Sequence, residues 1–281
     1  MKKILVGLDF SAASKNAFEY ALLLARDIKA ELVLLHTYLP IRDHGDYPEE
    51  IIEFTRKNEK DRAAEKLKKL TVFYPNKDEE KFLKHNVSIQ YLVKEGVPVP
   101  TILKTALELE ADLIISGAKS GGQLTKLILG SITRELINKA TLPILLIPDN
   151  YSYNGIREIA YATNLEGKDE EAFNWVNNFG KIVKAQVHSF NVSLMPYDFS
   201  RSKEEEWPSK YLPRVNGVPT RVRIIRDASF QSGVKYYLSA HPSDILAMFV
   251  PNRSMLNQFF HISKTQQMVL NNRLPVLIYH A

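Results

Sequence analysis

The 281-residue sequence contains no cysteine. This excludes disulfide scaffolds, thiolate metal centres, Cys-x-x-Cys redox chemistry and cysteine nucleophiles. No apolar run approaches the roughly 18 residues of a membrane-spanning helix, and the longest, such as residues 144–147, have the length of strands. The N-terminus starts basic and apolar like a signal peptide, but Asp9 interrupts it and no cleavage-like segment follows. We therefore expect a cytoplasmic protein that does not interact with membranes.

Motifs of the common metal and catalytic sites are also missing. The seven histidines form no His-x-His or His-Glu-x-x-His pair, so no metal site is predicted. There is no Gly-x-Ser-x-Gly elbow, no Walker lysine loop and no Rossmann Gly-x-Gly-x-x-Gly. His36 closes an expected strand and is interpreted as a hydrogen-bonded histidine beneath a cleft. The sequence therefore predicts no catalytic residue and a protein that is not an enzyme.

The excess of basic charge is small. The chain has 37 Lys and Arg against 32 Asp and Glu, a net charge of +5. In the densest basic stretch of the second half, residues 221–226, arginines alternate with apolar residues, which is typical of a strand with one solvated edge. The acidic run Glu204, Glu205 and Glu206 is expected to be a solvated loop. We predict no nucleic-acid partner.

The chain contains an internal repeat. Residues 2–37 align without gaps on residues 157–192, and residues 87–148 align on residues 219–280 in the same order. The identical pairs include Lys29 with Lys184 and Asp112 with Asp244. Proline, aspartate, asparagine and glycine cluster between the copies, so we predict two domains. They are unit one, residues 1–149, and unit two, residues 155–281, which is shorter in its middle.

Each unit alternates expected strands and helices. In unit one we predict strands over residues 4–8, 31–37, 87–93, 112–116 and 143–147, and helices over residues 15–29, 48–70, 99–110 and 124–139. Strands that are continuously apolar and separated by helices are typical of parallel pairing with both sheet faces covered. The fold class is therefore α/β, with a five-stranded doubly wound parallel sheet in each of two tandem domains.

Two stretches of unit one fall where such a sheet binds ligands, beyond the carboxyl ends of its strands. One is residues 7–11 after the first strand, and the other is the glycine-rich loop of residues 116–122 that leads to residues 130–133. Glycines let backbone N–H groups approach an anion, and a helix N-terminus adds a favourable dipole. The alternative is a tight strand-to-helix connection that needs glycine only for packing. For Asp9, an N-cap role in competition with Ser11 is also open.

The spacing Gly117-x2-Ser120-x9-Gly130-Ser131-x-Thr133 resembles the universal stress protein family, whose ATP-binding members carry Gly-x2-Gly-x9-Gly-Ser/Thr. The stretch Val6-Gly-Leu-Asp-Phe-Ser, the pair Glu95-Gly96 and the order of elements resemble it too. The resemblance covers essentially the whole chain as a tandem pair with an adenine nucleotide alpha hydrolase-like fold. It implies an intramolecular pseudo-dimer through the fifth strands, and a homodimer is left open.

The resemblance also implies an ATP site in unit one. Asp9, the backbone of Gly7 and Leu8, and Thr37 would form the base and ribose side. Five residues would hold the phosphates and Lys119 would screen their charge; the five are Gly117, Ser120, Gly130, Ser131 and Thr133. The family's second glycine is Ser120 here, and a serine at a position that needs positive φ costs about 1 kcal/mol. Gly121 and Gly122 follow directly and would restore flexibility.

Unit two departs from the pattern at the matching positions. Asn164, Phe249, Asn252 and Ile262 replace Asp9, Gly117, Ser120 and Gly130, while Ser263 and Thr265 persist. Bulky residues stand where the backbone would approach phosphate. We therefore predict that unit two binds no nucleoside triphosphate in the family's way and serves as the structural half.

Three functional hypotheses follow. The first is a tandem universal stress protein that binds ATP or a related adenine nucleotide in unit one and acts as a sensor or adaptor with a protein partner. The second is a nucleotide-free protein-interaction scaffold of the same fold. The third is a slow nucleotide hydrolase, which would lack a visible base or arginine finger.

Overall fold

The structure is a computed structural model that describes most of the chain. The described residues are 1–40, 48–72, 87–121, 126–128, 131–163, 169–194, 203–206, 214–215, 218–219, 222–250 and 274–279. Among them, no helix is long and apolar enough to cross a membrane.

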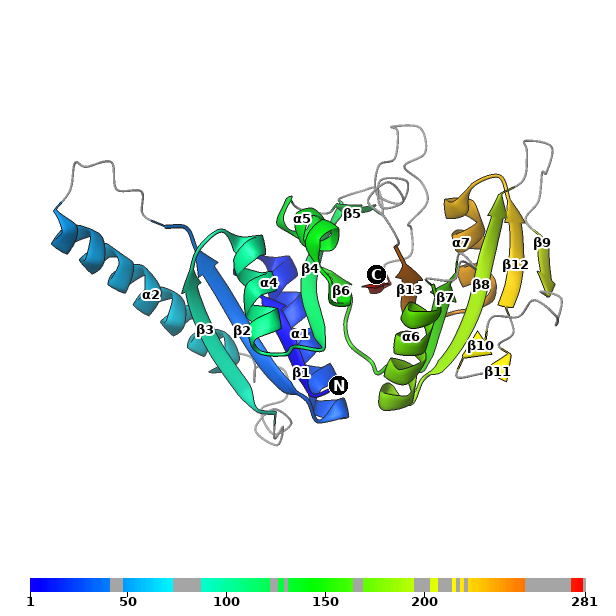
Figure 1. Ribbon diagram of the computed structural model, residues 1–281, viewed down its shortest axis with the longest axis horizontal. Helices are drawn as coiled ribbons and strands as arrows, with labels where there is room; N and C mark the ends of the chain where they lie inside the picture. The colour runs from blue at the N-terminus through cyan, green and yellow to red at the C-terminus, as the bar shows by residue number, and fades with distance from the viewer. Residues whose placement is uncertain are drawn as a thin grey trace.

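The first half of the chain alternates strands and helices (Figure 1). Its elements are β1 (Lys3–Gly7), α1 (Ala12–Ile28), β2 (Glu31–Tyr38), α2 (Glu49–Val72), β3 (Ile89–Glu95), α4 (Pro98–Glu108), β4 (Leu113–Gly121), β5 (Lys126–Ile128), α5 (Ser131–Lys139) and β6 (Ile144–Pro148).

The second half repeats this order with different insertions. Its elements are β7 (Glu158–Ala162), α6 (Asp169–Val183), β8 (Gln186–Leu194), β9 (Lys203–Glu206), β10 (Arg214–Val215), β11 (Val218–Pro219), β12 (Val222–Asp227), α7 (Phe230–Ala240), β13 (Ile245–Phe249) and β14 (Val276–Tyr279). Where the first half has α2, the described residues of the second half have the short strands β9, β10 and β11.

All the major strands join one continuous sheet. Its order is β3-β2-β1-β4-β6-β14-β13-β7-β8-β12-β9, so the five strands of the first half meet those of the second in reverse order. Pairing within each set of five is parallel, whereas β6 and β14 pair antiparallel, with Leu145 opposite Leu277. The α/β fold class and the pairing of two doubly wound units through their fifth strands are confirmed.

Successive residues of a strand point to opposite faces of the sheet. Both faces are therefore apolar, and helices cover each of them. On β1, Ile4 and Val6 belong to the core beneath α1, α2 and α6, while Leu5 belongs to the core beneath α4, α5 and α7. Both cores contain residues of both halves. The two units therefore share buried apolar surface.

The identical pair Asp112 and Asp244 of the repeat has the same structural task in both halves. Asp112 Oδ2 accepts hydrogen bonds from the backbone N–H groups of Lys2 and Lys3 at the start of β1. Asp244 Oδ2 accepts from the N–H groups of Arg157 and Glu158 at the start of β7. Each aspartate thereby provides a hydrogen-bond acceptor for two backbone N–H groups at the start of the neighbouring strand.

Sequence-based expectations were wrong in two regions. In the first, the stretch of residues 116–122 that was expected to be a loop is strand up to Gly121. The helix predicted over residues 124–139 begins only at Ser131, because residues 126–128 form β5 and pair antiparallel with an extended β4. The acidic run of residues 204–206 is not a loop: it lies in β9, an antiparallel edge strand beside β12. In both cases cross-strand pairing overrides the local pattern.

Candidate functional site

The turn after β1 forms one wall of a cleft. The Asp9 carboxylate accepts a hydrogen bond from the Ser11 N–H at 2.9 Å, and the Ser11 hydroxyl accepts from the Ser14 N–H at 3.2 Å. Ser11 is thus the N-cap of α1, and Asp9 braces the turn that precedes it. Phe10 has a φ of 62°, so the chain turns sharply between the strand and the helix.

His36 closes the turn from below. Its Nδ1 lies 2.7 Å from the Leu8 carbonyl oxygen, which accepts only, so Nδ1 carries the proton. The imidazole ring packs against Phe10 with a centroid distance of 4.6 Å. His36 therefore fixes the position of the turn, as interpreted from the sequence.

Gly117 forms the opposite wall in β4, next to the start of α1. A Cβ at this position would lie 2.4 Å from the Ala13 carbonyl group and 2.8 Å from the Ser14 nitrogen, which are backbone atoms. Only glycine fits between β4 and α1. The hydroxyl of buried Thr133, in the first turn of α5, donates to the Gly117 carbonyl oxygen at 3.2 Å.

The walls enclose an open cleft of about 560 Å³, including space that is open to solvent. It lies at the carboxyl ends of β1 and β2 and beside Ser116 and Gly117 of β4, where the strand order of a doubly wound sheet reverses. Its lining residues are Gly7, Leu8, Asp9, Ser11, Ser14, Leu35, Thr37, Pro98, Ile102, Ser116, Gly117, Ile132, Thr133 and Leu136.

Six of the ten predicted site residues line this cleft: Gly7, Leu8, Asp9, Thr37, Gly117 and Thr133. Two others, Lys119 and Ser131, are not among the described lining residues, and the backbone of Ser120 continues β4 into its hairpin with β5. Gly130 lies outside the described residues. The turn after β1 and the α5 N-terminus thus come together, whereas the glycine-rich stretch up to residue 121 is extended.

Sequence reasoning missed the apolar part of the cleft. Pro98 and Ile102 reach it from the first turns of α4, and Leu136 reaches it from α5. The signal was present, because α4 begins directly after an expected strand whose carboxyl end faces the same edge. Apolar residues at helical spacing are usually assigned to the core, so this signal is weak.

Among the described lining residues, Asp9 is the one that carries a charge. Burial acts to raise the pKa of its carboxyl, but hydrogen bonds from Ser11 and Ser14 outweigh burial and lower the pKa below its ordinary value. The group is ionised at neutral pH. The cleft thus combines one carboxylate, backbone amides, hydroxyls and an apolar wall.

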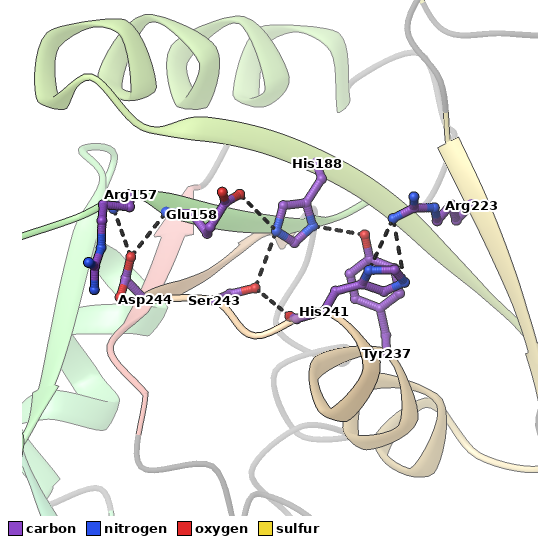
Figure 2. Close-up of polar contacts among 8 residues, drawn as sticks. All are labelled: Arg157, Glu158, His188, Arg223, Tyr237, His241, Ser243 and Asp244. Atoms are coloured by element: carbon purple, nitrogen blue, oxygen red, sulfur yellow. Dashed lines mark hydrogen bonds and ion pairs between the residues drawn. The ribbon is translucent and has the colours of Figure 1, made fainter.

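Unit two has a second polar cluster, near the amino ends of its strands (Figure 2). His188 Nδ1 lies 2.8 Å from the Tyr237 hydroxyl, and its Nε2 lies 3.3 Å from the Ser243 hydroxyl. Because Ser243 donates to the His241 carbonyl at 2.9 Å, its oxygen can accept from His188 Nε2–H. Tyr237 then donates to Nδ1, which assigns a neutral His188 in a closed hydrogen-bond network.

The nucleotide positions of unit two lie mostly outside the described residues. Phe249, which matches Gly117, is described and is 5% exposed. A large side chain is therefore buried where unit one has glycine against α1. The absence of a triphosphate site in unit two stays a prediction. Across the described residues, no cluster of three His, Asp or Glu side chains is arranged to hold a metal ion.

Comparisons with known proteins agree with this architecture. A solved universal stress protein from Archaeoglobus fulgidus is similar over 99% of this chain and 98% of its own, with a TM-score of 0.69 and 15% identity.

The sequence comparisons identify the family. A universal stress protein from Thermus aquaticus is 30% identical over 146 residues, which are 52% of this chain and 98% of that protein. The model of the universal stress protein family matches residues 1–148. The chain therefore belongs to the universal stress protein family.

Proposed function

We propose that the cleft of unit one binds an adenine nucleotide, with ATP as the expected ligand, and that the chain is a cytoplasmic sensor or adaptor in a stress response. The observation that carries the proposal is the open cleft between the end of β1 and Gly117 of β4. Ligands of doubly wound sheets bind at this switch point. Family membership supports the stress-response role.

The lining suits the parts of such a ligand. Pro98, Ile102 and Leu136 offer an apolar wall for a flat base. Asp9 and Thr37 offer a carboxylate and a hydroxyl for ribose hydroxyl groups. Ile132 and Thr133 lie in the first turn of α5, whose free N–H groups and dipole favour phosphate.

The phosphates require compensation for the charge of Asp9. Its carboxylate is the one charged group among the lining residues that the structure describes, and it repels a polyphosphate. In the proposal, Lys119 and the phosphate-holding positions Ser120, Gly130 and Ser131 supply this compensation together with the α5 N-terminus. Adenosine, AMP and ATP therefore form the informative ligand series.

Isothermal titration of the full chain with this series tests the proposal. We expect one saturable ATP site per chain, and we expect Thr37→Trp to abolish binding because its indole would fill the cleft. Leu39→Trp is the matched control, since Leu39 is two residues farther along the chain, 65% exposed and outside the lining. Absence of saturable binding to the parent chain would remove the nucleotide function.

The packing of Gly117 favours a second candidate, a nucleotide-free interaction scaffold. Glycine is required there by the backbone of α1 alone, so its presence does not depend on a phosphate. The same titration separates the two functions, because a scaffold binds none of the three ligands. Slow hydrolysis would instead appear as phosphate release from ATP that is lost in Asp9→Ala.

A further inference from the structure

The first turns of α2 expose large apolar side chains. Figure 1 shows α2 running obliquely past β3, with its first turns beyond the edge of the sheet. Phe54 is 66% exposed and Ile51 is 49% exposed. The buried residues of the helix are Ile52, Ala63, Leu67 and Leu70. Ile52 is therefore the one buried side chain of the first three turns, and Arg56 adds an ion pair with Glu95 on β3 at 3.5 Å.

Four exposed residues lie on the face of these turns that is opposite to the buried residues. At 100° per residue, Phe54 points away from the stripe formed by the buried residues. Glu50 and Lys57 lie on the same outward side, at i−4 and i+3 from Phe54, and Ile51 lies beside them. We call Glu50, Ile51, Phe54 and Lys57 the outward row. Glu50 and Lys57 are both exposed and make no ion pair with the described residues.

The outward row is complementary to itself when it is read in the opposite direction. One end is acidic, the centre is apolar and the other end is basic. In an antiparallel pair of such helices, Glu50 of one copy faces Lys57 of the other at both ends, and the two Phe54 rings meet in the middle. Interhelical distances of about 8–10 Å allow these contacts.

We propose that the outward row is a contact between two copies of this chain, in which the α2 helices pack antiparallel about a two-fold axis near Phe54. The charge pattern selects a second copy because the same surface supplies both complementary halves. Unit two has the short strands β9, β10 and β11 in the place of α2. Counted over the part of the chain that the structure describes, each chain therefore has one such surface, and the assembly closes as a dimer.

The contact is small, so the dimer is transient. A single helix crossing falls below the roughly 1,200 Å² of standard interfaces. Exposed ion pairs contribute little energy, and their role is to set orientation. Phe54 supplies most of the affinity because its exposed ring is the largest apolar group of the outward row. The inference does not depend on nucleotide binding in unit one.

Sedimentation velocity of the full chain over a concentration series tests the proposal. We expect reversible dimerisation that Phe54→Ser weakens at least about tenfold. Leu107→Ser is the matched control, because Leu107 is a 60% exposed apolar residue on α4. Circular dichroism melts of both variants verify that they fold.

Charge exchange tests the orientation. Glu50→Lys and Lys57→Glu should each weaken self-association, because like charges then meet at both ends. An equimolar mixture of these two variants should dimerise again, and so should the double variant E50K/K57E. Recovery in both experiments requires antiparallel pairing of residue 50 with residue 57.

Two results would overturn the proposal. One is a chain that remains monomeric at protein concentrations up to about 1 mM. The dissociation constant of the dimer would then exceed about 1 mM, and the association would be negligible. The other is a dimer that Phe54→Ser leaves intact. If the monomer instead binds a synthetic amphipathic Leu/Lys helix, and Phe54→Ser abolishes that binding, the outward row is a docking site for a basic helix and not for a second copy.

Discussion

At the scale of single residues, Gly117 shows how one absent side chain serves both packing and the cleft. The close approach of α1 to β4 leaves no space for a Cβ. The same approach places the turn after β1 opposite α5 across the cleft. A substitution of Gly117 is therefore expected to disturb the packing of α1 on β4, whether or not a ligand is bound.

Gly117→Ala should destabilise the chain by about 3 kcal/mol, because its methyl group would overlap backbone atoms that cannot rotate away. Gly155→Ala is the control: Gly155 has a φ of 83° and no atom within 4 Å of the place that a methyl group would take, so the expected loss is only about 1 kcal/mol of backbone strain. Urea denaturation measures both. Equal losses would contradict the packing role.

His188 should make stability depend on pH. Burial, with the nearby charges of His241 and Arg223, lowers the pKa of His188 to about 4. In the unfolded chain, His188 takes up a proton near pH 6.5, whereas in the folded chain it does so only near pH 4. The contribution of His188 to the free energy of unfolding is therefore fully present above pH 6.5 and is lost as the pH falls to about 4. The expected loss is up to about 3 kcal/mol. His188→Gln should flatten the unfolding free energy across this window, and an unchanged slope would exclude His188 as the cause.

At the scale of elements, the two halves end their first helices in the same way. Lys29 after α1 and Lys184 after α6 adopt left-handed φ values of 56° and 61°. The following residues, Ala30 and Ala185, donate back to the carbonyls of Ala25 and Gly180. These are C-terminal helix caps in which glycine is usual.

Lys29→Gly and Lys184→Gly should each stabilise the chain by up to about 1 kcal/mol, because glycine adopts this backbone conformation without steric strain. Thermal denaturation checks this. Lys15→Gly, inside α1, is the control and should destabilise by about 1 kcal/mol. A loss of stability in both cap variants would contradict the strain argument.

Sequence patterns predicted the alternating elements but not their pairing details. Gly117 indicated the end of β4, yet the strand continues to Gly121, since the glycine is there for α1 and not for a turn. The apolar spacing of residues 124–139 indicated one helix, but its first part pairs with β4. For the site, residues at strand ends were predictable, whereas Pro98 and Ile102 were not, because their apolar side chains resemble core residues.

At the scale of the whole molecule, the sheet joins both units through β6 and β14. The linker adds contacts, because the Tyr153 hydroxyl donates to Asp27 on α1 and the Asn16 side chain donates to the carbonyls of Pro148 and Tyr151. Shared cores on both faces couple the halves.

We therefore expect the chain to unfold in one cooperative transition. Both tryptophans, at positions 175 and 207, lie in unit two, so their fluorescence reports that unit, whereas circular dichroism reports both units. The two urea denaturation curves should coincide. Leu277 is fully buried in β14, opposite Leu145 of β6. Leu277→Ala should therefore shift both curves together and lower the free energy of unfolding by about 2–5 kcal/mol. Separate midpoints would show independent units.

The central claim is that unit one holds a nucleotide in the cleft between the carboxyl end of β1 and Gly117 of β4. A crystal structure of the full chain grown with saturating ATP tests it most directly. We predict density for one nucleotide per chain, in contact with the turn of residues 7–9 and with the first turn of α5. A cleft that stays free of nucleotide under these conditions, or density confined to unit two, would contradict the account.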